Sequence, residues 1–333
     1  KYRDNDISRI YAGDRFIDQV IYNNTVIFNS FKGDLTNWIY ENNNGQITLL
    51  EYTGSYSDSK PVYVPHYGNN IVVNNYDSSY SNISTPFYNN PSVKSVDFQR
   101  IPYLNGNMYK AFYNSVNLTS VVRMDRNVSN TKEAFYHTSI ANSHGFFSSA
   151  SSLEDASSTF DSCYRLTNAS LTFNNCVNLI NASSAFNSCY NLVNAEGVFA
   201  NCSNLTDISG VFNNCVNLRS ATINGVKVKN AAYAFNGCSN LVMGAHSFPS
   251  IKNAAYAYQN TGIARGSEAF LDCVNLEDAE STFRNCTSLT STQNTFKGCR
   301  NLVSALNTFS GCINATSATN VFNGCTSLNN ITG

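Results

Sequence analysis

Apolar residues return along much of the chain at a fixed interval of thirteen residues. Residues 186–202 read FNSCYNLVNAEGVFANC, so the pattern F-x-x-C-x-x-L begins again thirteen residues after its first phenylalanine. The same step separates two runs of phenylalanine: Phe160, Phe173, Phe186, Phe199 and Phe212, then Phe270, Phe283, Phe296, Phe309 and Phe322. A period of this kind indicates stacked units, each of which buries its apolar face against its neighbours.

Cysteine occupies a single position of this repeat. All 11 cysteines follow a phenylalanine of the repeat by three residues: Cys163, Cys176, Cys189, Cys202, Cys215, Cys238, Cys273, Cys286, Cys299, Cys312 and Cys325. None forms a C-x-x-C pair, and no histidine accompanies them at the spacing of a metal site. Parallel side chains in one column are poorly placed for disulfides, so we expect a structural ladder of buried, reduced thiols.

Leucine and a small residue complete the buried pattern. Leucine usually follows cysteine by three residues, and alanine often comes three further on. The residue before cysteine is often Gly or Asn, which tolerate a positive φ: Gly237, Gly298, Gly311, Gly324, Asn175, Asn201, Asn214 and Asn285. Each unit is therefore predicted to hold a short helical turn that ends in a left-handed residue, followed by a short extended segment.

The units vary in length. Phe87, Phe112, Phe135 and Phe147 begin earlier units, in which other residues replace cysteine. Some units are 23 residues long and insert about ten residues such as TINGVKVKNA, which is predicted to add a strand. Two units of twelve residues carry T-x-I in place of C-x-x-L. With Tyr258 counted in the phenylalanine column, the chain has sixteen units. If each unit is one coil, a rise of ~4.8 Å per coil predicts a rod of roughly 75 Å.

A second, polar ladder runs beside the leucines. Asparagine directly precedes leucine at Asn178, Asn191, Asn204, Asn217, Asn240, Asn275 and Asn301. Stacked amides can bond the backbone or the side chain of the next coil, so we expect a structural role for this column.

The N-terminal segment has a different pattern. Residues 7–28, ISRIYAGDRFIDQVIYNNTVIF, predict three short strands with turns at Ala12-Gly13-Asp14 and at Asn23-Asn24. Three strands in so short a segment are marginally stable alone, so we expect the segment to dock onto another protein. The predicted division is a small β attachment segment at 1–33, strands that cap the solenoid at 34–86, and the solenoid at 87–333.

Two resemblances add to this pattern. AFNGCSNL and AFYNSVNLTSV resemble the leucine-rich repeats of the BspA type, and residues 47–75 resemble the strands that precede such arrays. Together with the counted spacings, this resemblance predicts a BspA-like leucine-rich-repeat solenoid of short 12–13 and 23-residue coils, each a short strand plus a helical turn. The thirteen-residue units depart from the family pattern, because its repeats have about the longer length. The resemblance also implies surface adhesion and host binding without enzymatic activity. Residues 7–28 resemble the I-Y-x-G-D…V-x-Y-x-x-x-x-V-Y segments of phage tail and other virion structural proteins.

Composition and charge exclude several classes of partner. Charged residues make up 13% of the chain, about half the usual share, and the net charge is −1. Such a chain has no electrostatic footprint for nucleic acid or anionic lipid. No apolar run approaches the ~18 residues that span a bilayer, so membrane insertion is not expected.

Candidate catalytic groups find little support in the sequence. The four histidines, His66, His137, His144 and His246, share no repeat position. Two acidic pairs, Glu154-Asp155 and Glu277-Asp278 with Glu280, occupy equivalent repeat positions but lie too many coils apart to act as paired carboxylates. We expect solvated turn residues here, with no catalytic residue, no metal site and no cofactor.

Three tyrosines form the candidate binding site. Tyr88, Tyr113 and Tyr136 each follow a phenylalanine of the repeat, so we expect them to line up on the outside about one coil apart. Exposed tyrosines at this spacing suit stacking on sugar rings or an aromatic-rich protein contact. The alternative is that they pack against the N-terminal segment together with Tyr76 and Tyr80.

These observations favour a non-enzymatic, adhesin-like rod on a phage tail or fibre. Its N-terminal segment would attach to other virion proteins, and its solenoid would bind a host-surface glycan or protein. One alternative is a BspA-like adhesin on a bacterial cell surface, and a second is an architectural spacer or decoration protein of a larger assembly. The chain stops at CTSLNNITG without a polar capping unit, so we expect it to belong to an oligomeric assembly.

Overall fold

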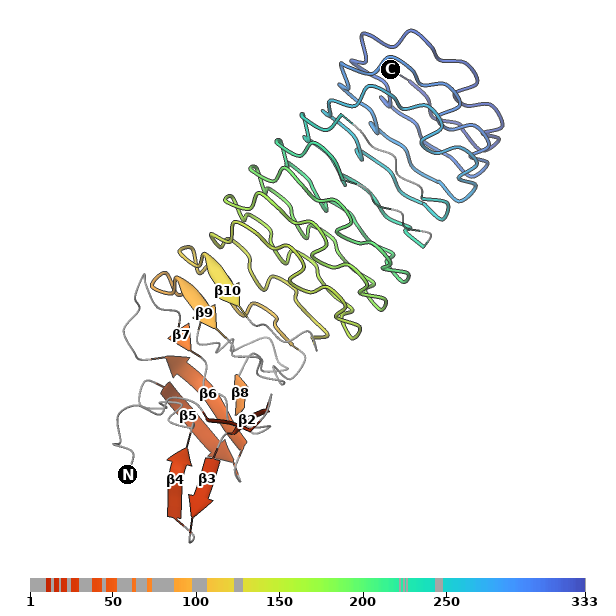
Figure 1. Cartoon of the computed structure of the whole chain (residues 1–333). Coiled ribbons are helices and arrows are strands. Elements are labelled where there is room, and N and C mark those ends of the chain that lie inside the picture. The colour runs from red at the N-terminus through yellow and green to blue at the C-terminus, as the bar shows by residue number, and fades with distance from the viewer. Residues whose placement is uncertain are drawn as a thin grey trace.

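The computed structural model shows a rod of stacked coils, with strands gathered near its N-terminal end (Figure 1). The structure describes residues 87–97, 107–122, 128–221, 223, 225, 227–242 and 248–332, together with the backbone of strands β1 to β8. All statements below concern these residues.

Two antiparallel hairpins form the first four strands. These are β1 (Ile10–Ala12), β2 (Arg15–Ile17), β3 (Gln19–Tyr22) and β4 (Thr25–Asn29). The closing pairs Ala12↔Arg15 and Tyr22↔Thr25 flank the positions where turns are predicted. The expectation of three strands is wrong, because the central run divides between Ile17 and Gln19 into two strands that pair with different partners.

The next six strands introduce parallel pairing. They are β5 (Trp38–Asn43), β6 (Gln46–Tyr52), β7 (Val62–Tyr63), β8 (Ile71–Val73), β9 (Ser95–Asp97) and β10 (Ser120–Val122). One sheet has the order β5-β6-β8 and the other β10-β9-β7. In the second sheet Ser95 pairs with Ser120 in parallel, one coil further along the chain. The predicted boundaries at residues 33 and 86 stay predictions.

Along the rod, single residues of successive coils also pair in parallel, and these bridges give the length of a coil. Asn168 bridges to Asn194, and Asn181 bridges to Asp207. Each pair is two repeat units apart in sequence, so one coil contains two thirteen-residue units. The prediction that each unit forms its own coil is therefore wrong. A single unit supplies one turn at an edge and one wall, and it needs a second unit opposite to enclose a core.

The phenylalanines consequently form two columns, one along each edge of the rod. The first contains Phe87, Phe112, Phe135, Phe160, Phe186, Phe212, Phe235, Tyr258, Phe283 and Phe309; the second contains Phe147, Phe173, Phe199, Phe248, Phe270, Phe296 and Phe322. Within a column the rings stack, as for Phe160 and Phe186 with centroids 5.5 Å apart. About ten coils at ~4.8 Å give a rod of roughly 45 Å, shorter than predicted.

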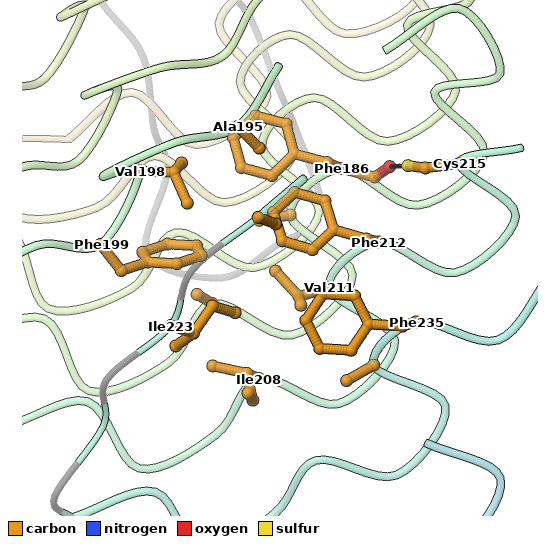
Figure 2. Close-up of a cluster of buried hydrophobic side chains, with 14 of the residues drawn as sticks. Phe186, Ala195, Val198, Phe199, Ile208, Val211, Phe212, Cys215, Ile223 and Phe235 are labelled. Atoms are coloured by element: carbon orange, nitrogen blue, oxygen red, sulfur yellow. Dashed lines mark hydrogen bonds between the residues drawn. The ribbon is translucent and has the colours of Figure 1, made fainter. Parts of the chain in front are cut away.

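Each 23-residue unit forms a complete coil, whereas a thirteen-residue unit forms half of one. Between Phe212 and Phe235 the opposite side of the core is filled by the buried Ile223 and Val228. Figure 2 shows Phe186, Phe212 and Phe235 in one column, with Phe199 and Ile223 across from them. Among the described residues of the TINGVKVKNA insert, Asn230 alone forms β-bridges, one to Asp207 and one to Asn253, so an extra strand is not seen there.

Each edge turn contains two left-handed residues. The residue before cysteine is left-handed as predicted, with a φ of 60° at Asn175 and 74° at Gly237. A second lies two residues before phenylalanine, with a φ of 54° at Ser184 and 55° at Leu171. The described units contain overlapping turns in place of the predicted helical turn. Sequence gives little sign of the second position, because many residue types occupy it.

Backbone hydrogen bonds explain how these strained residues are held. Alternate N–H groups close the turn, as from Cys189 to the Phe186 carbonyl at 3.2 Å. The others donate to the next coil, as from Ser184 to Ser209 and from Phe186 to Val211. The edge backbone is thus satisfied partly by its neighbour, which makes its conformation depend on stacking.

Two ladders of side-chain amides reinforce the coils. The predicted ladder before leucine is present: Asn178 donates to the Ser151 carbonyl at 2.8 Å, and Asn191 to the Tyr164 carbonyl at 2.7 Å. A ladder that the sequence analysis missed opens each edge turn, where an Asn or Asp side chain accepts the N–H two residues on. Asn168 accepts from Ser170 in this way at 3.0 Å.

Replacing one stacked ring should show how strongly the columns stabilise the rod. Phe186 is fully buried between Phe160 and Phe212, so we expect Phe186→Ala to lower the free energy of unfolding by about 3–5 kcal/mol. The control is Tyr190→Ala, because Tyr190 is 43% exposed; it should cost less than about 1.5 kcal/mol. Urea unfolding of both variants measures this, and equal losses would contradict the two-column core.

Candidate functional site

The cysteines form hydrogen-bonded ladders inside the rod. Cys215 Sγ donates to the Phe186 carbonyl of the preceding coil at 3.1 Å (Figure 2), and Cys189 Sγ donates to the Phe160 carbonyl at 3.1 Å. The same bond is made by Cys163, Cys176, Cys202, Cys238, Cys273, Cys286, Cys299, Cys312 and Cys325. All eleven thiols are free, and nine are buried. Each thiol thus adds a bond between coils.

Burial also makes most of these thiols unreactive; the half-buried Cys325 differs, because a hydrogen bond with Cys299 lowers its pKa. Burial raises the pKa of Cys163, Cys176 and Cys202 from about 9 to about 12, and it raises those of Cys189 and Cys215 well above 9. Nucleophilic attack and metal binding both need the thiolate. The described residues also contain no group of three His, Cys, Asp or Glu side chains that could hold a metal ion. A purely structural role for the ladder stays a prediction, in keeping with the burial of the thiols and their bonds between coils.

The acidic candidates have local partners in the turns. Asp155 accepts the Ser157 N–H at 2.8 Å, and Asp278 accepts the Glu280 N–H at 2.9 Å. Both belong to the amide and carboxylate ladder that opens the edge turns. Glu277 forms an ion pair with Lys252 at 3.1 Å. These contacts account for the carboxylates as turn residues.

The histidines are dispersed in the same way. His144 Nδ1 lies 2.7 Å from Ser170 Oγ, in a contact between coils. His137 Nδ1 lies 2.9 Å from Asn114 Oδ1. His66 and His246 lie outside the described residues.

Tyr88, Tyr113 and Tyr136 lie in one stack along the first edge. The ring centroids of Tyr88 and Tyr113 are 5.4 Å apart, and those of Tyr113 and Tyr136 are 4.6 Å apart. Lys110 Nζ lies 5.0 Å from the centre of the Tyr113 ring and 3.4 Å from a carboxylate oxygen of Glu133. All three tyrosines are half-buried. Tyr76 and Tyr80, the proposed alternative partners, lie outside the described residues.

The stack continues onto the neighbouring wall of the rod. His137 contacts Tyr164 edge-on with centroids 5.4 Å apart, and Tyr164 stacks on Tyr190 at 5.4 Å. We call Tyr88, Tyr113, Tyr136, His137, Tyr164 and Tyr190 the aromatic ribbon. Sequence reasoning missed its second half. The sequence signal that could have revealed it is the separation of Tyr164 and Tyr190 by two repeat units. This spacing places the two tyrosines on neighbouring coils only if each coil contains two units.

The interior rings of the ribbon present their edges and hydroxyl groups rather than their faces. Tyr113 has a neighbouring ring on both faces, and Tyr164 has His137 and Tyr190 as neighbours. The pKa of Tyr113 is raised mainly by burial. The neighbouring Tyr136 and Glu133 raise this pKa further, and Lys110 lowers it. The phenol therefore stays neutral and can donate a hydrogen bond. A sugar stacks on an open ring face, so this surface suits a protein contact better.

Leucine-rich repeat proteins are among the solved structures to which this chain is similar. No protein-family model and no curated protein matches the sequence. A leucine-rich repeat protein from Bacteroides ovatus is similar at 16% identity and a TM-score of 0.32, over 89% of this chain and 92% of that one. A leucine-rich repeat protein from T. pallidum is similar at 18% identity and a TM-score of 0.30, over 73% of this chain and 89% of that one.

A third similar structure is a leucine rich cell surface protein from Faecalibacterium prausnitzii. It is 16% identical with a TM-score of 0.20, over 89% of this chain and 92% of that one. The assignment of this chain as a repeat solenoid rests on its own coils, because likenesses at these scores add no argument. Within the described residues, no helix has the length and apolarity to cross a membrane.

The raised thiol pKa values predict a loss of stability at alkaline pH. Unfolded thiols lose their protons near pH 9 while the buried ones keep theirs to about pH 12, so the unfolded state gains stability as pH rises above about 9. Each thiol contributes about 1.4 kcal/mol per pH unit. The quantity of interest is the slope of the free energy of unfolding against pH, expressed as the number of protons released on unfolding. We expect the triple variant Cys163→Ser, Cys189→Ser, Cys215→Ser to reduce this slope by up to three protons.

Urea unfolding under reducing conditions between about pH 8 and about pH 11 tests this, because it measures the slope directly. Serine is a suitable replacement for cysteine here, because Ser115 naturally occupies the cysteine position of its unit and donates the equivalent hydrogen bond to the Phe87 carbonyl. Lysines and tyrosines are the same in the wild type and in the triple variant, so their contribution cancels in the difference between the two slopes. An unchanged slope in the triple variant would contradict the buried, neutral ladder.

Proposed function

We propose that this protein is a non-enzymatic recognition solenoid of a bacterial cell surface, and that it binds a protein partner through the aromatic ribbon. The observation that carries the proposal is the continuity of the ribbon over successive coils. Such a surface contrasts with the rest of the first edge, where Asn187, Asn213 and Asn236 follow the phenylalanines.

The composition of the ribbon supports a protein partner. Tyrosine is enriched at the energetically dominant positions of protein interfaces, where an apolar ring and a hydroxyl act together. Tyr164 and Tyr190 are 41% and 43% exposed, and the nearby Val193 is 40% exposed. Stacking already fixes the rings, so binding would cost little side-chain entropy.

The cell-surface setting replaces the phage particle as our first choice. It rests on the sequence resemblance to BspA-type repeats, and none of the similar structures named above is described as a virion protein. The resemblance of residues 7–28 to virion proteins stays a prediction. A purely architectural spacer would have no need of an exposed aromatic ribbon. We keep the two N-terminal hairpins as the proposed attachment to another component of the surface.

The test is a triple variant of the first half of the ribbon. We expect Tyr88→Ser, Tyr113→Ser, Tyr136→Ser to weaken binding of the labelled protein to cultured epithelial cells at least about tenfold, because three aromatic contacts are lost. Trypsin treatment of the cells should have the same effect. The control is Val303→Ser, which removes a 45% exposed apolar side chain outside both the ribbon and the second site proposed below and should leave cell binding unchanged.

Two results would contradict the proposal. One is full binding by the triple variant, and the other is binding that survives trypsin. Circular dichroism and urea unfolding of the triple variant check that the rod is intact. Collapse of the fold would instead make the three tyrosines part of the core.

A further inference from the structure

We propose that Tyr233 and the gap over Gly210 form a second site, which binds a neutral pyranose sugar of an oligosaccharide. This site lies outside the aromatic ribbon and takes a different class of ligand. It therefore goes beyond the proposed function and does not depend on it.

Tyr233 occupies the left-handed position two residues before phenylalanine in the first edge. The residue at the same position in the following coil is Tyr256, and the two rings stack with centroids 4.7 Å apart and planes 3° apart. Tyr256 is itself fixed, because its hydroxyl donates to Glu280 Oε1 at 2.6 Å. That bond raises the pKa of Tyr256 and keeps it a donor. One face of Tyr233 is therefore covered by an anchored ring.

The opposite face of Tyr233 is open. At the same position in the preceding coil stands Gly210, whose N–H donates to the Ala232 carbonyl at 2.8 Å and so places it next to Tyr233 in the column. Glycine has no side chain to cover the ring. Tyr233 is 43% exposed although Tyr256 covers one of its faces, and its described contacts include no second ring. Inside the aromatic ribbon, by contrast, Tyr113 has a ring on both faces.

Polar groups surround the space above Gly210. A Cβ atom at Gly210 would lie 3.2 Å from Ser184 Oγ and 3.9 Å from the Cβ of Asn213, so both side chains line the space. Asn213 belongs to an amide row: it donates to Asn187 Oδ1 at 3.0 Å and accepts from Asn236 Nδ2 at 2.8 Å. An amide has two N–H donors and two acceptor lone pairs. Beyond these two bonds, the Asn213 amide has a second N–H and a second acceptor lone pair.

This combination fits a neutral sugar better than a cation or a flat aromatic ligand. A pyranose with equatorial hydroxyls places its C–H face on the ring and directs its hydroxyls to the amide row. A cation would need an unpaired carboxylate, but Glu280 is bonded to Tyr256, and Asp161 accepts from Ser162 and Asn187.

The experiment uses cellohexaose and chitohexaose as probes, with the whole chain, by calorimetry and saturation-transfer NMR. We expect one of them to bind, and Tyr233→Ser to weaken that binding at least about tenfold. Gly210→Tyr should abolish it by stacking a ring on the open face. That position accepts large side chains, since Lys110, Leu171 and Tyr256 adopt positive φ there.

The matched control is Asn307→Tyr. Asn307 has the equivalent left-handed position, with a φ of 53°, but it lies beyond Tyr256 and away from the open face. We expect it to bind the hexasaccharide like the wild type. The triple variant of the aromatic ribbon should also keep hexasaccharide binding while losing cell binding.

Three results would overturn the proposal. The first is that neither hexasaccharide binds the wild type. The second is that Gly210→Tyr binds as well as the wild type. The third is that the ribbon variant loses sugar binding while Gly210→Tyr keeps it, which would move the sugar to the ribbon. Cell binding is measured separately, so failure of this site and failure of the ribbon are distinguishable.

Discussion

Direct stacking of aromatic rings in two facing columns is the constraint on which the rest of the rod depends. Thirteen residues supply one edge turn and one wall, and they cannot enclose a core alone. Rings such as Phe160 and Phe186 can therefore lie one above the other only when a second unit, with Phe173, crosses on the opposite side. Two units per coil follow from this. The left-handed residues, the thiol bonds and the amide ladders all repeat in that register.

Local periodicity predicted the buried columns well, because a residue type that recurs at one repeat position meets the same environment in each coil. The burial of Phe, Cys and Leu, the positive φ before cysteine and the amide ladder before leucine could all be read from the sequence. The coil length could not, since a period gives the repeat without saying whether a unit is a whole turn or half of one. The 23-residue units held the clue, because a spacing so close to two units is itself a complete coil.

In the candidate sites, too, local sequence signals were sufficient for some residues, whereas others depend on how the coils stack. Tyr88, Tyr113 and Tyr136 were found because each directly follows a phenylalanine, which is a local signal. Their continuation through His137 to Tyr164 joins residues that are adjacent only across coils. Which ring faces are open is also a property of stacking. It distinguishes the ribbon, whose rings cover one another, from Tyr233, which stands above a glycine.

The two-unit coil is tested most directly by crosslinking engineered cysteines on the outer wall. Positions 164 and 190 lie on neighbouring coils with stacked rings 5.4 Å apart, whereas position 177 belongs to the opposite wall. Dibromobimane joins two thiols only when they lie close together and does not require the geometry of a disulfide, and the buried native thiols do not compete for it. We expect dibromobimane to crosslink Tyr164→Cys with Tyr190→Cys in the folded protein, as seen by peptide mass spectrometry, and to leave Tyr164→Cys with Val177→Cys without a crosslink. A crosslink in the second pair but not in the first would contradict the account.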